Sequence, residues 1–192
     1  MVKVAVVLAP GFEEMEALAP VDLLRRANFS VDMIGLQEEV TGSHNITVKV
    51  DQVISPSLMT YDLIVIPGGQ PGANNLKDNE IVIEALKSAY ANGNKIAAIC
   101  AGPIVLEKAN LLTGKNYVSF PGTETKIKRG QRQANAIVVR DGNILTARGA
   151  GAAYEFSLAL IEMLGGDAAE IRDSIQYTNV INNYIQKSSS KK

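Results

Sequence analysis

Short apolar runs separated by helical patterns constrain the fold of this chain more than any other feature. Runs rich in Val, Ile and Leu occupy residues 3–9, 30–36, 63–66 and 95–99. Continuous runs of this kind are typical of strands buried on both faces. Their alternation with helices predicts an α/β fold: a mostly parallel sheet with helices on both faces. Ligands bind such folds at the carboxyl ends of the strands.

Helical periodicity and turn residues predict the remaining elements. We expect helices over about residues 13–28, 79–92, 102–110, 152–164 and 168–177. Pro20 lies inside the first of these and should kink it or remove one hydrogen bond. The helix at 79–92 should pack its apolar side chains into the core, namely Ile81, Ile83, Leu86 and Ala89.

Turn signals organise the segments between these helices. Residues 38–54 are polar and predict a hairpin or an excursion from the sheet, followed by one helical turn at 55–59. Asp141-Gly142 predicts a second hairpin, of strands 136–140 and 143–147. Residues 111–133 carry little pattern beyond a short strand at 117–120. We expect one domain over residues 1–186 and a disordered charged tail at 187–192.

Composition excludes several classes of partner. The 192 residues carry a net charge of −1, which favours neither nucleic acid nor a membrane surface. The basic segment 126–132 has no interleaved aromatic residues, so we expect a solvated loop there. A single cysteine forms no internal disulfide and fits the reducing cytoplasm, and the N-terminal apolar run lacks the layout of a signal peptide. With one Cys and one His, we expect no metal site.

Cys100 ends an apolar run and is followed by Ala101, Gly102 and Pro103 before the next helical pattern. A side chain between a buried strand and a helix lies on a tight turn, the geometry of a nucleophile elbow. The helix start favours a thiolate over a thiol. The structural alternative is a buried cysteine that only packs.

Glu16 is the candidate partner of this cysteine. Its helical stripe is largely apolar, which would desolvate the carboxyl and raise its pKa. A protonated Glu donates a hydrogen bond to a thiolate and serves as an acid at neutral pH. The alternative, which the residues alone favour, is that Glu16 caps the first helical turn beside Glu13 and Glu14.

Backbone groups after the preceding strand complete the candidate site. Gly68 and Gly69 follow the strand at 63–66, so their N–H groups could form an oxyanion site, or the pair could be a simple turn. His44 is the only histidine, and its polar surroundings favour a surface position.

Five motifs in order resemble the DJ-one/ThiJ/PfpI superfamily, specifically its branch of parkinsonism-associated protein deglycases. The resemblance extends over residues 3–166, and the five motifs lie at residues 11–16, 20–26, 66–73, 97–103 and 145–151. The resemblance implies a flavodoxin-like three-layer αβα sandwich that forms a homodimer near the first helix. It also implies activity without a cofactor.

The resemblance assigns roles to particular residues. Cys100 becomes the nucleophile and Glu16 its protonated partner, while Gly69 and Ala101 offer backbone N–H groups to an oxyanion or an oxidised sulfur. Arg26 corresponds to an arginine near the pocket, across the dimer. The implied substrates are methylglyoxal, a small α-oxoaldehyde, and its glycated adducts.

The chain departs from the family pattern at Phe120. Relatives carry an active-site histidine before a proline there, whereas Phe120 precedes Pro121. His44 falls roughly where relatives carry a pocket arginine. Two hypotheses therefore stand: a cofactor-free glyoxalase or deglycase with slowed turnover, and a redox sensor or chaperone whose Cys100 is oxidised to sulfinate. A protease is disfavoured because Ala101, not His, follows the cysteine.

Overall fold

A seven-stranded sheet forms the centre of the structure, a computed structural model that describes residues 2–189. Its strands are β1 (Lys3–Leu8), β2 (Ser30–Gly35), β5 (Gln52–Val53), β6 (Leu63–Ile66), β7 (Lys95–Ile99), β10 (Val138–Asp141) and β11 (Ile144–Ala147). They lie in the order β10-β11-β7-β6-β1-β2-β5, and only β10 and β11 pair antiparallel. The predicted mostly parallel sheet is confirmed.

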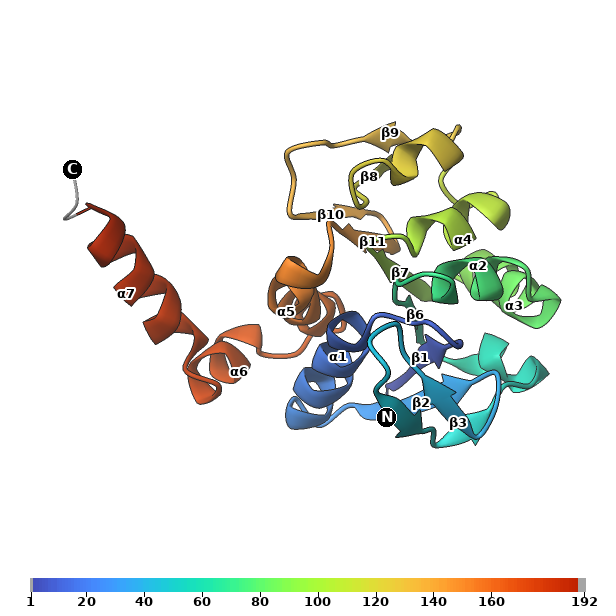
Figure 1. The fold of residues 1–192 in the computed structure, drawn as a ribbon, viewed down its shortest axis with the longest axis horizontal. Helices are drawn as coiled ribbons and strands as arrows, with labels where there is room; N and C mark the ends of the chain where they lie inside the picture. The colour runs from blue at the N-terminus through green and yellow to red at the C-terminus, as the bar shows by residue number, and fades with distance from the viewer. Residues whose placement is uncertain (1, 190–192) are drawn as a thin grey trace.

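Two helix layers cover this sheet. One face carries α1 (Glu14–Arg26), α5 (Ala153–Met163) and α6 (Ala168–Ser174), and the other carries α2 (Gly72–Lys77), α3 (Glu80–Ala91) and α4 (Pro103–Lys108) (Figure 1). Alternate residues of β1 point into the two cores: Val6 packs in the cluster with Phe156, whereas Val7 packs in the cluster with Leu86. Period-2 alternation thus produces the predicted αβα sandwich.

Helix α3 begins later and faces the core differently from the prediction. The Asn79 side chain accepts the N–H of Val82 at 3.1 Å, so Asn79 caps the helix. Val82 is buried and Ile81 is 37% exposed. The prediction of Ile81 as a core residue is therefore wrong, while Ile83, Leu86 and Ala89 are core residues as expected.

The helices α2 and α7 (Tyr177–Ser189) were not predicted. Helix α2 reads Gly-Ala-Asn-Asn-Leu-Lys, a composition more typical of a turn. The single helix expected over 168–177 ends at Ser174, and Gln176, with φ 61°, turns the chain into α7. Helix α7 packs against α6 and extends away from the body (Figure 1). It includes residues 187–189 of the expected tail, whereas residues 190–192 lie outside the described part.

Short strands shape the loops around the sheet. The predicted hairpin is β3 (Glu39–Thr41) paired with β4 (Thr47–Lys49), followed by the helical turn η1 (Pro56–Thr60). Between β4 and this turn, strand β5 joins β2 in the main sheet, which the sequence did not indicate.

The strand predicted at 117–120 stops at Tyr117, because only β8 (Asn116–Tyr117) pairs, with β9 (Gln131–Arg132). Beyond it, the Phe120 N–H donates to the Cys100 carbonyl at 2.9 Å. This bond places Phe120 beside the cysteine. Within residues 2–189, every helix is too short or too polar to span a bilayer.

Candidate active site

Cys100 lies on the predicted elbow between β7 and α4. Its backbone φ is 62°, in the left-handed region that an L side chain rarely adopts. Its N–H donates to the Ala147 carbonyl at 3.0 Å, and its carbonyl accepts from Phe120. The neighbouring strand and loop therefore hold a strained residue in place, as is common at reactive sites. The thiol is half-buried.

Two glycines make room for this elbow. A Cβ on Gly102 would lie 2.5 Å from the Ile66 carbonyl oxygen. A Cβ on Gly68 would lie 2.8 Å from the Cys100 Cβ and 2.6 Å from Glu16 Oε2. Any larger residue at either position would push the turn off the end of the sheet, so the small residues are steric requirements.

Glu16 is fully buried in the first turn of α1 and lies across Gly68 from the cysteine. Its Oε2 accepts the N–H of Gly68 at 2.8 Å. Its Oε1 is buried and has no hydrogen-bond partner among the described residues. The helix is capped by Glu13, whose Oε2 accepts the N–H of Glu16 at 2.8 Å. Glu16 is therefore not the cap that the residues alone favoured, and Oε1 is the oxygen free to carry a proton.

Burial controls the titration of this pair. Desolvation raises the pKa of Glu16 to about 7, although the neighbouring Cys100 thiol and the N–H of Gly68 act to lower it. Burial also raises the pKa of the Cys100 thiol, and the Glu16 carboxylate adds to that rise. This direction is opposite to the one expected from the helix start. The two groups titrate as a coupled pair, so the protonation state of each depends on that of the other.

Backbone N–H groups oppose this rise at the sulfur. Those of Ala101 and Gly69 hydrogen-bond the Cys100 side chain and lower its pKa. The N–H of Gly68 is used by Glu16 instead. Gly68 thus positions the acid, and only Gly69 and Ala101 remain as donors to a negative charge on or near sulfur.

A cavity of about 380 Å³ opens beside the cysteine. It is lined by Phe120, Pro121, Ile137, Arg148, Gly149, Ala150, Gly151 and Ala152. A Cβ on Gly149 would lie 3.3 Å from the Phe120 ring and 3.9 Å from Cys100 Sγ, so Gly149 lies between the cavity and the sulfur. Arg148 was not predicted as a lining residue; the signal was its place directly after β11, at a carboxyl end of the sheet.

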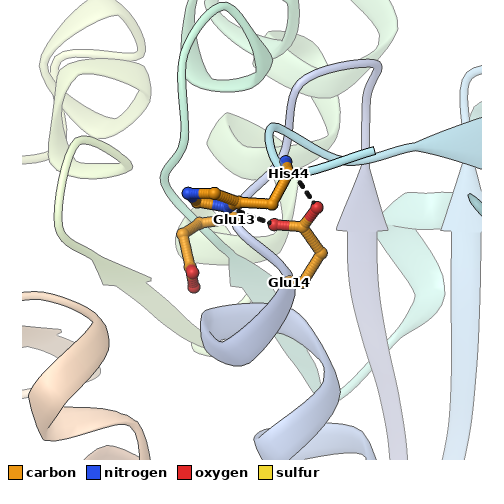
Figure 2. Close-up of side chains that lie close together, drawn as sticks. All are labelled: Glu13, Glu14 and His44. Atoms are coloured by element: carbon orange, nitrogen blue, oxygen red, sulfur yellow. Dashed lines mark hydrogen bonds and ion pairs between the residues drawn. The ribbon is translucent and has the colours of Figure 1, made fainter. Parts of the chain in front are cut away.

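His44 and Arg26 each pair with a carboxylate of α1. His44 Nδ1 pairs with Glu14 Oε2 at 2.9 Å, close to Glu13 (Figure 2). Arg26 pairs with Asp22 at 3.0 Å in the last turn of α1. Because a helix rises 1.5 Å per residue, Arg26 lies about 15 Å from Glu16 and does not join the Cys100 site within its own chain.

The group Glu13, Glu14 and His44 has donor atoms within 4.8 Å of one another. Protein N–H groups already use these oxygens, because Glu13 Oε2 caps α1 and both Glu14 oxygens bind His44. Within the described residues, the arrangement is thus a hydrogen-bonded acid–imidazole pair.

Comparison with known proteins identifies the family of this chain. Residues 2–163 match the DJ-1/PfpI family. The chain is 39% identical to protein dj-1beta of Drosophila melanogaster, over 84% of this chain and 88% of the relative. It is 30% identical to a deglycase of Pyrococcus abyssi, over 84% and 99%.

Solved structures share the fold. The crystal structure of Drosophila melanogaster DJ-1beta has a TM-score of 0.87 at 36% identity, covering 91% of this chain and 97% of that one. A structure described as oxidized Toxoplasma gondii DJ-1 has a TM-score of 0.86 at 38% identity, covering 91% and 98%. The flavodoxin-like sandwich inferred from the motifs is confirmed, and the chain belongs to the DJ-1/PfpI family.

Proposed function

We propose that the chain is a cysteine-dependent, cofactor-free glyoxalase or protein deglycase acting on methylglyoxal or its early adducts in the cytoplasm. The observation that carries the proposal is the fully buried Glu16 carboxyl, which lies beside a strained Cys100. Burial raises the pKa of Glu16 to about 7. A carboxyl with such a pKa both accepts and returns a proton at neutral pH. The name of the Pyrococcus relative supports the same chemistry.

The reaction is an internal redox exchange followed by hydrolysis. The Cys100 sulfur attacks the aldehyde carbon, its proton passing to Glu16, and the N–H groups of Gly69 and Ala101 stabilise the oxyanion. Proton transfer from the aldehyde carbon to the neighbouring ketone carbon, through an enediol, oxidises the first and reduces the second. The product is a lactoyl thioester, which water hydrolyses to lactate and the free thiol. Lactate formation by wild-type protein and by Cys100→Ser tests the proposal.

A redox-sensor function is the second candidate, and the Phe120 ring favours it. A phenyl ring transfers no proton, which slows carbonyl turnover but does not affect oxidation of sulfur. Peroxide converts a thiolate to sulfenate and then sulfinate, releasing water at each step. Gly69, Ala101 and a protonated Glu16 would each donate a hydrogen bond to the sulfinate oxygens.

Mild peroxide treatment is expected to add two oxygen atoms at Cys100. Intact-mass measurement and peptide mapping check this, with Cys100→Ala as the control for methionine oxidation. In Glu16→Leu, which has no donor for the sulfinate, we expect the product to pass to the sulfonate or to stop at sulfenate. A wild-type mass unchanged under conditions that also leave Met intact would exclude the sensor function.

We also propose a homodimer that forms through α1. An apolar groove of about 400 Å³ runs along this helix, lined by Met15, Leu18, Ala19, Ile46 and Tyr154 among others. Met15 is 54% exposed and Tyr154 is 45% exposed. An apolar surface of this kind is typical of an interface. In such a dimer, the exposed Arg26 can approach the site of the second copy.

Met15→Asp is expected to weaken the dimer about 100-fold or more, because burying an unpaired carboxylate costs several kcal/mol. Light scattering during size exclusion, over a range of protein concentrations, measures the change. Met59→Asp is the matched control, since Met59 is an exposed methionine outside the groove. Equal masses for wild type and Met15→Asp at every concentration would contradict an interface on this face.

A further inference from the structure

A buried carboxylate holds the only histidine of the chain. The Glu14 side chain is 6% exposed, and the His44 side chain is 70% exposed. Glu14 Oε1 accepts the His44 backbone N–H at 2.7 Å, and Oε2 contacts the ring Nδ1 at 2.9 Å. Figure 2 shows the imidazole above Glu13, with Nδ1 toward Glu14 and the second ring nitrogen pointing away. Glu14 thus fixes the loop and the ring together.

The loop is built for this contact. A Cβ on Gly42 would lie 2.4 Å from Glu14 Oε1, so only glycine allows the carboxylate to reach the loop. The Ser43 hydroxyl donates to Glu14 Oε2 at 3.3 Å. A carboxylate that accepts the Nδ1 proton leaves Nε2 as the position from which a proton is given to or taken from a ligand. The same carboxylate–imidazole geometry orients the general base in hydrolase triads.

Glu13 joins this pair to the cysteine site. Its carboxylate lies within 4.8 Å of the His44 ring, and its Oε2 accepts the N–H of Glu16. Its own N–H donates to the Gly68 carbonyl at 3.0 Å, next to the Gly69 amide that bonds the Cys100 sulfur. Glu13 therefore connects the imidazole with the segment that holds Glu16 and the sulfur donors.

The proposed isomerisation requires a proton donor at this position. When the first carbon of an α-oxoaldehyde is bound to Cys100 and Glu16 removes its proton, negative charge develops on the oxygen of the second carbon. Glu16 carries only one proton at a time, and Phe120 carries none. A second acid near neutral pH would stabilise the enediolate by protonating that oxygen, and would take a proton back from the hydroxyl of the first carbon as the thioester carbonyl forms.

Resting on the proposed function, we propose that His44 is the catalytic acid for the second oxygen of the α-oxoaldehyde, with Glu14 as its positioning residue. The Nε2–H donates to that oxygen as the enediol forms, and the oxygen keeps this proton as the hydroxyl of the lactoyl group. When the second carbon accepts a proton from Glu16, the hydroxyl of the first carbon gives its proton to His44 and becomes the thioester carbonyl. The charged groups facing His44 are Glu14, from α1, and Glu13, from the cap. The hydrogen bond and charge of Glu14 raise the pKa of His44 above its ordinary value.

The protonation states of the Glu16–Cys100 pair and of His44 determine how activity depends on pH. Activity requires that the Glu16–Cys100 pair has lost one proton, which gives a rising limb near pH 7. It also requires protonated His44, so activity falls as pH rises through the pKa of His44. His44→Ala should lose this falling limb and lower kcat about 100-fold, with little change in KM. Added imidazole should restore part of kcat in His44→Ala.

The test measures lactate formation from methylglyoxal between pH 5 and pH 9. The variants are wild type, His44→Ala, Glu14→Gln and Cys100→Ser, with Lys49→Ala as an exposed control on the same hairpin. Glu14→Gln should move the falling limb to lower pH. Because the chain has one histidine, its NMR titration gives the His44 pKa without assignment and shows whether each variant retains the fold.

Each outcome decides between the two proposals. If wild type forms lactate and His44→Ala matches its kcat and falling limb, the role of His44 is overturned while the proposed function stands. If wild type forms no more lactate than Cys100→Ser, the proposed function fails and the role of His44 fails with it. Loss of the falling limb, together with rescue by imidazole, supports the acid role over a purely structural one.

Discussion

Cys100→Ser is expected to lower lactate formation from methylglyoxal at least about 1,000-fold. Serine keeps the shape of the side chain and the positive φ of the elbow, so the hydrogen bonds to Ala147 and Phe120 remain. A hydroxyl, however, has a far higher pKa than a thiol. Glu16, whose pKa is about 7, is a base better matched to a thiol than to an alcohol, whose proton it is too weak to remove. The nucleophile is therefore lost without loss of structure.

The measurement uses an enzymatic lactate assay with purified proteins and matched thermal-unfolding curves. Cys100→Ala gives a second variant that lacks both nucleophile and hydrogen-bond donor. Iodoacetamide treatment of wild type offers an independent route, because Cys100 is the only cysteine that can be alkylated. Equal rates in wild type and Cys100→Ser, with both proteins folded, would show that the sulfur takes no part in turnover.

The central strands β1, β6 and β7 could be predicted because they are continuous apolar runs buried on both faces. Such runs are compatible with few structures other than a buried strand, and both ends of β6 agree with the prediction. The helix α2 could not be predicted, because its Gly and Asn residues favour turns and its stability comes from the burial of Ala73 and Leu76. Tertiary packing there outweighs local propensity.

The site was only partly predictable, for a different physical reason. The elbow is local, so the order strand, Cys100, Ala101, Gly102 was enough to predict it. The partner of a given carboxylate depends on contacts between distant segments. Residues alone favoured a capping role for Glu16, and Glu14 was not singled out. In the structure, Glu13 caps α1, Glu14 pairs with His44, and Glu16 lies beside Cys100.

The pKa directions also depend on three-dimensional burial. A helix start predicts a lowered thiol pKa, and this expectation counted only the backbone charges. Burial of Cys100 and the charge of Glu16 act against it. Burial cannot be inferred from neighbours in sequence, so the sign of the shift at Cys100 was wrong even though the residue was correct.

Glu16→Gln is expected to stabilise the fold at pH 8 by about 3 kcal/mol relative to wild type. The pKa of Glu16 rises from an ordinary value of 4.5 to about 7 in the folded chain. A shift of that size corresponds to about 3 kcal/mol, by 1.36 kcal/mol for each pKa unit. The folded chain holds the proton more tightly than the unfolded chain, so wild-type stability falls as pH rises from 4.5 through 7.

The pH dependence distinguishes this cause from a general packing effect. Below pH 4.5 both states of wild type are protonated, and the difference between wild type and Glu16→Gln should be small. Urea unfolding from pH 4 to pH 8 measures the free energy of unfolding, and this range stays below the ordinary titration of a thiol. Glu84→Gln is the matched control at an exposed glutamate that pairs with Lys87. A constant difference across the range would contradict the raised pKa.

Activity should change in the opposite direction to stability in the same variant. Glutamine can still accept the N–H of Gly68, so α1 and the turn at Gly68-Gly69 keep their positions. It cannot take the thiol proton or move a proton between two carbons, so kcat should fall about 100-fold or more. A buried carboxyl that weakens the fold at neutral pH is retained where its proton is used. Gain of stability together with loss of turnover in Glu16→Gln would therefore identify Glu16 as a functional and not a structural acid.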